Sequence, residues 1–176
     1  TGTLTVKGTS NIHAGTGASD ITLSDPNNKF GGAVTLTGAA TKITDFDALT
    51  LGTLATGNLT VISTGALNLG QGTVTGNLAA TSNGGAVTQT AALTVTDTLT
   101  LSTAGGNATL NGFANAVTNL GASALGTGEL KLLDAGGLTV TGAVGATGGI
   151  ALNTSGALAV NNTLDATGST MSLTTT

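Results

Sequence analysis

Hydrophobic residues along this chain occur in short alternating strings rather than in helical stripes. Triplets such as Leu59-Thr60-Val61 and Leu138-Thr139-Val140 recur from end to end. An apolar–Thr–apolar triplet has the two-residue period of a half-buried β-strand, and the β-branched Thr and Val suit a pleated sheet. Gly, Asn, Asp and Ser gather between the triplets, as in Asn83-Gly84-Gly85, and supply the turns. We therefore predict an all-β fold.

The triplets repeat about every 20 residues and fall into three interleaved series, which is the sequence signature of a solenoid. Successive members of a series lie 17 to 21 residues apart. The first series is Leu59, Leu78, Leu99, Val117, Leu138, Leu158; the second is Leu67, Val87, Ala108, Leu125, Val144, Leu164; the third is Val74, Leu93, Phe113, Leu130, Ile150, Met171. A weaker repeat of 79 to 87 residues extends the pattern toward the N-terminus, where Val34, Ile43 and Leu49 form one turn and Ile21 and Phe30 belong to the turn before it.

Three short strands in each turn of about 20 residues predict a right-handed parallel β-helix, or β-solenoid, of about nine turns. Residues 1–176 are expected to form one β-helical segment, excised from a longer chain. A β-sandwich is the alternative, but it does not predict a 20-residue period. The structural core is expected to contain Leu59, Leu67, Val74, Leu78, Val87, Leu93, Leu99, Phe113, Val117, Leu130, Leu138, Val144, Ile150, Leu158, Leu164 and Met171. The outward threonines that follow inward apolar residues are expected to stack on one face: Thr5, Thr35, Thr60, Thr100, Thr118 and Thr139.

Composition narrows the range of functions. Charged residues make up 7% of the chain, no Arg is present, and the net charge is −4. A nucleic-acid partner is not expected, because phosphate binding needs basic groups and an aromatic content of 2% offers little surface for stacking on bases. The lack of Cys excludes disulfides and Cys-ligated zinc. A hydrophobic content of 39% argues against a disordered linker, and no run of about 18 apolar residues predicts a membrane helix.

Chemistry-bearing side chains are few and scattered. His13 is the only imidazole, and no motif links it to Ser10 or Asp20, so we expect a surface histidine rather than a catalytic one. We predict no catalytic, cofactor-binding or metal-binding residue, no cofactor and no enzyme activity, since no turn carries more than a few charges. Asp20 and Asp25 are interpreted as turn residues. Glu129 and Lys131 flank Leu130 and are expected to pair weakly.

Asp45 and Asp47 flank Phe46 and leave two alternatives open. Alternate residues of a strand point the same way, so the two carboxylates could share a face with a cation, although calcium takes six to eight oxygen ligands. The simpler interpretation is a solvated turn with Phe46 packed inward.

Four stretches carry a family resemblance: NNKFGGAVTLTG (Asn27 to Gly38), ITDFDALTLGT (Ile43 to Thr53), GNLTV (Gly57 to Val61) and GNLAATSNGGAVTQTAALTV (Gly76 to Val95). They resemble the repeats of large secreted bacterial exoproteins of the filamentous haemagglutinin type, which are exported by two-partner secretion. The resemblance implies a right-handed β-helix, passage through an outer-membrane transporter and display on or release from the cell surface. It says little about a ligand.

The first hypothesis is therefore a structural stalk or repeat segment of a secreted, surface-displayed bacterial adhesin or fibre that mediates attachment. Its expected partners are neighbouring β-helix repeats of the parent chain, a host or neighbouring-cell surface or matrix, and further copies joined end to end. The second hypothesis is a ligand-binding module with a glycan or protein receptor on the loops Asp25 to Phe30 and Asp45 to Asp47. Ice binding is a remote third, because only Thr98-Leu99-Thr100 shows a paired Thr-x-Thr form in the first series.

Overall fold

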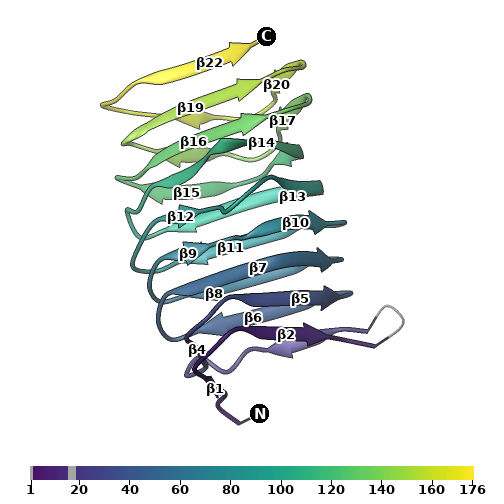
Figure 1. Cartoon of the computed structure of the whole chain (residues 1–176). Coiled ribbons are helices and arrows are strands. Elements are labelled where there is room, and N and C mark those ends of the chain that lie inside the picture. The colour runs from purple at the N-terminus through teal and green to yellow at the C-terminus, as the bar shows by residue number, and fades with distance from the viewer. Residues whose placement is uncertain (1, 16–18) are drawn as a thin grey trace.

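The chain winds into a single rod of stacked β-strands. The computed structural model describes residues 2–15 and 19–176, and within these ranges it contains strands and no helix. The N- and C-termini lie at opposite ends of the rod (Figure 1). Every strand pairing is parallel and joins a strand to one in the next turn. The result is a parallel β-solenoid of about eight turns of about 20 residues, one turn fewer than expected.

Each turn contributes strands to three faces. The long strands β7 (Leu49–Thr56), β13 (Leu93–Thr103) and β14 (Ala108–Leu120) each bend round a corner and belong to two faces. The first face contains β3 (Ile21–Leu23), β6 (Thr41–Asp45), β8 (Leu59–Ser63), β11 (Leu78–Ser82), the end of β13 (Leu93–Thr103), β15 (Ser123–Gly126), β18 (Val144–Ala146) and β21 (Leu164–Asp165). The second contains the start of β7 (Leu49–Thr56), β9 (Leu67–Asn68), β12 (Val87–Thr88), the start of β14 (Ala108–Leu120), β16 (Glu129–Asp134), β19 (Gly149–Thr154) and β22 (Met171–Thr175).

The third face contains β2 (Ser10–His13), β5 (Val34–Gly38), the end of β7, β10 (Gln71–Val74), the start of β13, the end of β14, β17 (Leu138–Val140) and β20 (Leu158–Val160). A separate two-stranded sheet of β1 (Thr5–Val6) and β4 (Lys29–Phe30) lies at the N-terminal end.

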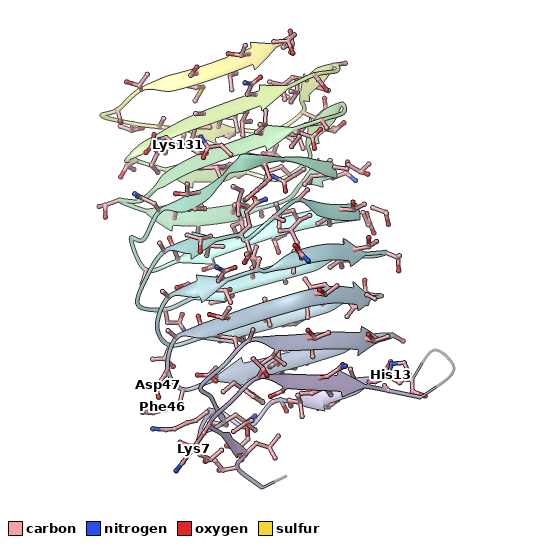
Figure 2. All side chains as sticks on the ribbon, in the orientation of Figure 1. Lys7, His13, Phe46, Asp47 and Lys131 are labelled. Carbon is pink, nitrogen blue, oxygen red and sulfur yellow. The ribbon has the colours of Figure 1, made fainter. Side chains whose placement is uncertain are left out.

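The outer surface of the rod carries mostly short polar side chains, but they do not form the single threonine row that the sequence suggested (Figure 2). Thr60 shares the first face with Thr100, and Ala79 lies between them in register. Thr35 and Thr139 belong to strands of the third face, and Thr5 belongs to β1. The expectation of one threonine face is therefore wrong, because consecutive strands of a turn point to three different sides.

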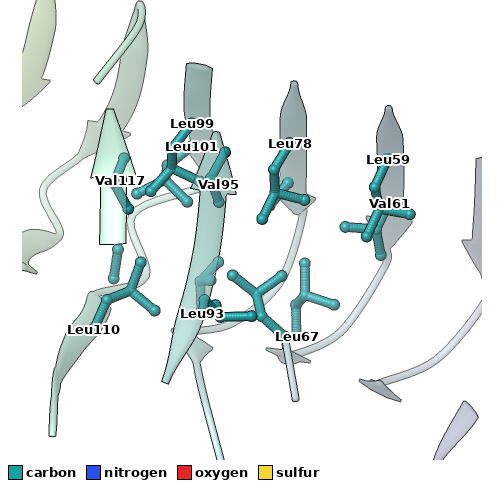
Figure 3. Packing of buried hydrophobic residues seen from close by; sticks show 14 of the residues in the cluster. Leu59, Val61, Leu67, Leu78, Leu93, Val95, Leu99, Leu101, Leu110 and Val117 are labelled. Atoms are coloured by element: carbon teal, nitrogen blue, oxygen red, sulfur yellow. The ribbon is translucent and has the colours of Figure 1, made fainter. Parts of the chain in front are cut away.

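Inward residues of successive turns stack directly on one another and form one continuous apolar core (Figure 3). Leu59, Leu78 and Leu99 are in register, and each is almost completely buried. Full burial of such a side chain contributes about 1.5–3 kcal/mol. Twelve of the sixteen expected core residues are buried: Leu59, Leu67, Val74, Leu78, Val87, Leu93, Leu99, Val117, Leu130, Leu138, Val144 and Ile150.

The expected alignment of the three series fails between their third and fourth members. Leu99 lies opposite Leu120 rather than Val117, and Val117 lies opposite Val95. On the second face, Ala108 lies opposite Leu130 rather than opposite the first-face residue Leu125. The register shifts between Leu110 and Asn115 of β14, where the strand carries extra residues. Each sequence series therefore moves to a neighbouring face at this point.

Four expected core residues are not fully buried. Phe113 belongs to the four exposed residues 111–114 that bulge from β14, and its side chain is 41% exposed, so its assignment to the core is wrong. Met171 is also 41% exposed because β22 pairs with β19 on one side only, although it lies in register with the buried Ile150. Leu158 and Leu164 in the last turns are partly buried against the core.

Polar groups and glycines complete the corners of the rod. The inward hydroxyls of Ser82 and Thr103 donate to the carbonyl oxygens of Gly85 and Gly106, at 2.9 and 2.6 Å. Such pairing removes the cost of burying a hydroxyl and a corner carbonyl. Gly106 is required by close approach, since an added Cβ would lie 2.1 Å from the carbonyl oxygen of Gly85 in the turn below.

Candidate binding corner

The two loops singled out by the second hypothesis lie together in the structure. We call residues 25–30 and 45–47 the N-terminal corner. The backbone N–H of Phe46 donates to the carbonyl oxygen of Asn28 at 2.8 Å, and Lys29 Nζ lies 3.5 Å from Asp47 Oδ2. Figure 2 shows Phe46, Asp47 and Lys7 close to one another at the N-terminal end, on the side of the rod away from His13. The fold thus gathers charged and aromatic groups that are otherwise scarce in this chain.

Asp45 is a structural anchor of the corner rather than a surface carboxylate. It ends β6 as an inward residue and is completely buried. Its Oδ2 accepts the backbone N–H of Phe30, and its Oδ1 accepts that of Asp47, both at 2.7 Å. Charge-assisted bonds of this length are strong. The bond from Phe30 ties residues 25–30 to residues 45–47, and the bond from Asp47 fixes the local backbone around Phe46. Asp45 and Asp47 therefore do not share a face for a cation.

Phe46 points outward, opposite to the expectation that it packs inward. Its side chain is 46% exposed, and Lys29 Nζ lies 4.8 Å from the centre of its ring. The inward position next to it is taken by Asp45, and alternation along the chain then turns Phe46 to the surface. A cation above an aromatic ring at this distance contributes about 0.5–1 kcal/mol at an exposed site. The ring is consequently held on a backbone that is anchored on both sides.

An open groove of about 440 Å³ lies at this end of the rod, and Lys29, whose Nζ lies over the Phe46 ring, is one of its lining residues. Its lining consists of Thr5, Val6, Lys7, Lys29, Phe30, Gly31, Asp47 and Ala48. Gly31 has no side chain, and a Cβ at that position would lie 2.8 Å from the carbonyl oxygen of Lys7. Sequence reasoning missed Lys7, because only the pairing of β1 with β4 brings it to this groove.

The remaining candidate residues have structural or solvent-exposed settings. Asp25 Oδ1 accepts the backbone N–H of Asn27 at 2.9 Å, which confirms the turn interpretation, and Asp20 accepts that of Ala40 in the next turn. His13 is exposed at the end of β2. Glu129 and Lys131 form an ion pair at 2.8 Å, as expected.

Two further buried side chains were not anticipated from the sequence. Asp134 accepts the backbone N–H groups of Val117 and Gly136, at 2.7 and 3.0 Å, and Asn115 accepts that of Leu93 at 2.9 Å. Like Asp45, each fixes a backbone N–H in the turn below it. In the residues that the structure describes, no three His, Asp or Glu side chains gather to hold a metal ion. The same residues contain no helix long and apolar enough to span a membrane.

Comparison with protein families finds a match to repeats of unknown function, DUF5649, over residues 1–37 and 56–119. The chain belongs to this family. The matched DUF5649 residues include the N-terminal strands β1 to β4 and the turns from β8 to β13, so the family repeat corresponds to stacked turns of the solenoid. Comparison with curated proteins and with solved structures found no match.

Proposed function

We propose that this chain is a structural segment of a secreted, surface-displayed bacterial adhesin or fibre, in which a stiff rod sets distance and presents other parts of the parent protein. The observation that carries the proposal is the continuous apolar core formed by inward residues of stacked turns, illustrated by Leu59, Leu78 and Leu99. Each turn contacts only its neighbours, so the rod gains length without needing a wider core. The resemblance to filamentous haemagglutinin-type repeats motivates the location outside the cell and the passage through an outer-membrane transporter.

The surface location is tested with antibodies raised against this chain. The proposal expects labelling of intact cells of the source bacterium, and loss of that labelling after brief protease treatment of whole cells. An antibody against a cytoplasmic protein serves as the control for cell integrity. Labelling that appears only after lysis would overturn the proposed location. Small-angle X-ray scattering of the purified chain tests the rod, because a stiff solenoid gives an elongated distance distribution that does not change with ionic strength.

The terminal turns support a proposed contact with neighbouring repeats or with further copies of the chain. Met171, Leu173 and Val160 lie in register with residues that are buried one turn below, yet they are exposed. Their strands pair on one side only, and free strand edges with apolar side chains are templates for further pairing. Sedimentation across a concentration series tests this, and a monomer at every concentration would contradict self-association.

A second candidate function is ligand binding at the N-terminal corner, with a glycan or protein receptor. The supporting observation is that the two loops form one anchored unit with an exposed aromatic ring and a groove. The expected result is binding that is lost when the exposed corner residues are changed, with unfolding temperatures that stay the same. Ice binding gains no support, because outward registers such as Thr60, Ala79 and Thr100 mix residue types.

A further inference from the structure

The N-terminal corner offers hydrogen-bonding groups of opposite kinds beside an apolar surface. An ammonium group is a donor only, and an ionised carboxylate is an acceptor only. Lys29 Nζ and Asp47 Oδ2 lie 3.5 Å apart, longer than a charge-assisted bond of about 2.7–2.9 Å. Both side chains are at least half exposed, so both retain unused hydrogen-bonding capacity.

Vicinal hydroxyl groups match this arrangement. Each hydroxyl both donates and accepts, so one hydroxyl of a neighbouring pair can accept from Lys29 while the next donates to Asp47. The Lys29–Asp47 pair carries no net charge, so a neutral pair of hydroxyls satisfies both groups without leaving a ligand charge uncompensated by this pair. Thr5 and Lys7 line the same groove and supply further polar groups, while Val6, Phe30 and Ala48 supply apolar surface. The 46% exposed ring of Phe46 adds an apolar platform beside the ion pair.

We propose that the N-terminal corner binds a neutral saccharide unit through Lys29, Asp47 and Phe46. This inference rests on the second candidate function and names its ligand class. The corner is preorganised, since Asp45 holds the backbone of Phe30 and Asp47, and Asn28 holds that of Phe46. Ligand binding then restricts few additional rotatable bonds, and a small loss of conformational entropy on binding favours affinity.

The test uses the purified chain and NMR titration with neutral probes, namely galactose, mannose and glucose oligosaccharides, alongside polygalacturonate and an acidic peptide as charged probes. The proposal expects saturable shifts of the Gly31, Phe46 and Asp47 amides with at least one neutral oligosaccharide. Phe46→Ala and Asp47→Ala are each expected to weaken that binding by about tenfold or more.

The chain supplies matched controls for these variants. Phe113 is similarly exposed at 41%, and Glu129–Lys131 is a second ion pair, so Phe113→Ala and Glu129→Ala should leave saccharide binding unchanged. Unfolding temperatures of all four variants separate lost binding from lost structure. Shifts at the corner with the charged probes alone would overturn the neutral-saccharide proposal while retaining the corner as a binding site. No shift with any probe would overturn both the saccharide proposal and the binding function of the corner. An equal loss of binding in the control variants would do the same.

Discussion

Gln89 and Asn115 exchange two side-chain hydrogen bonds across neighbouring turns: Gln89 Nε2 donates to Asn115 Oδ1 at 2.9 Å, and Asn115 Nδ2 donates to Gln89 Oε1 at 3.1 Å. Asn115 also accepts the backbone N–H of Leu93 and donates to the carbonyl oxygen of Leu110 at 2.8 Å. These bonds close the core immediately after the outward bulge of residues 111–114. The backbone at the end of the bulge is therefore fixed by side-chain hydrogen bonds.

Replacing Asn115 by Ala should lower the free energy of unfolding by about 3 kcal/mol, because the buried N–H of Leu93 loses its acceptor. Gln89→Ala should cost only about 1 kcal/mol, since Asn115 keeps its backbone partners. Urea denaturation followed by circular dichroism measures both. Asn111→Ala in the exposed bulge is the control, and an equal loss in that variant would contradict the role given to Asn115.

The two carboxylates of the N-terminal corner should respond differently to the same change. Asp45→Asn places an NH₂ group where a carboxylate oxygen accepts a backbone N–H, and should destabilise the chain by about 2 kcal/mol. Asp47→Asn alters an exposed ion pair and should change stability by less than about 0.5 kcal/mol. The difference between their denaturation midpoints is the measurement, and equal midpoints would refute the anchoring role of Asp45.

Thr56 is expected to be replaceable with a gain in stability. Its hydroxyl is buried without a hydrogen-bond partner among the described residues, and its register partner in the next turn is Val74. Thr56→Val removes the unpaired hydroxyl at nearly constant volume and should stabilise the rod by about 1 kcal/mol. Thr154→Val is the contrasting variant, because the Thr154 hydroxyl donates to Gly156 at 2.8 Å, and it should lose about 1 kcal/mol. Calorimetric melting of both variants shows whether each substitution raises or lowers the stability of the folded chain.

Substitution by Asp should destabilise the rod strongly at inward positions and only weakly at outward positions. Leu78→Asp and Leu99→Asp each bury an unpaired carboxylate and should destabilise the rod by about 3–5 kcal/mol. Phe113→Asp on the bulge should cost about 1 kcal/mol or less. Thermal unfolding is the readout, and unchanged melting of both leucine variants would show that the register is wrong.

Asp165 provides a prediction about pH. The hydroxyl of Thr167 and then its backbone N–H donate to the exposed carboxylate, and these bonds lower the pKa of Asp165 below its ordinary value. A lowered pKa in the folded state means that the stabilisation is present above the ordinary pKa and is lost as pH falls through the folded pKa. Thr167→Val should raise the pKa of Asp165 toward its ordinary value in an NMR titration, whereas Thr163→Val should leave it unchanged.

The strand period and the identity of most inward residues were readable from the sequence, because stacked turns repeat the same apolar spacing. The alignment across the bulge was not predictable, because Phe113 has the character of a core residue and the register shift beside it follows from the strand pairing. One signal was available: all three series shortened to 17 or 18 residues per step at the same place. The structure instead has Leu99 opposite Leu120 and Ala108 opposite Leu130, with longer steps.

The N-terminal corner was only partly predictable for a related reason. The loops were identified from their charges, and the fold brings them together. The sequence did not show whether Asp45 or Phe46 points inward. The answer depends on the residue at which the chain turns the corner, because a shift of one residue exchanges the inward and outward side chains of a strand. A carboxylate is rarely buried unless its oxygens accept hydrogen bonds. The two backbone N–H groups that donate to Asp45 are brought there by the fold and could not be identified from the sequence.

The close contact of glycines at one corner has a consequence for how such chains change in length. Gly106 meets the carbonyl oxygen of Gly85, and Gly128 meets that of Gly106, each at 2.1 Å from the position of an added Cβ. The same kind of contact thus joins these successive turns at this corner. Duplication or loss of one complete turn preserves each kind of contact, whereas an insertion of a few residues survives only by protruding, as residues 111–114 do. Unequal recombination between repeats can therefore lengthen or shorten the rod in whole turns without inventing a new interface.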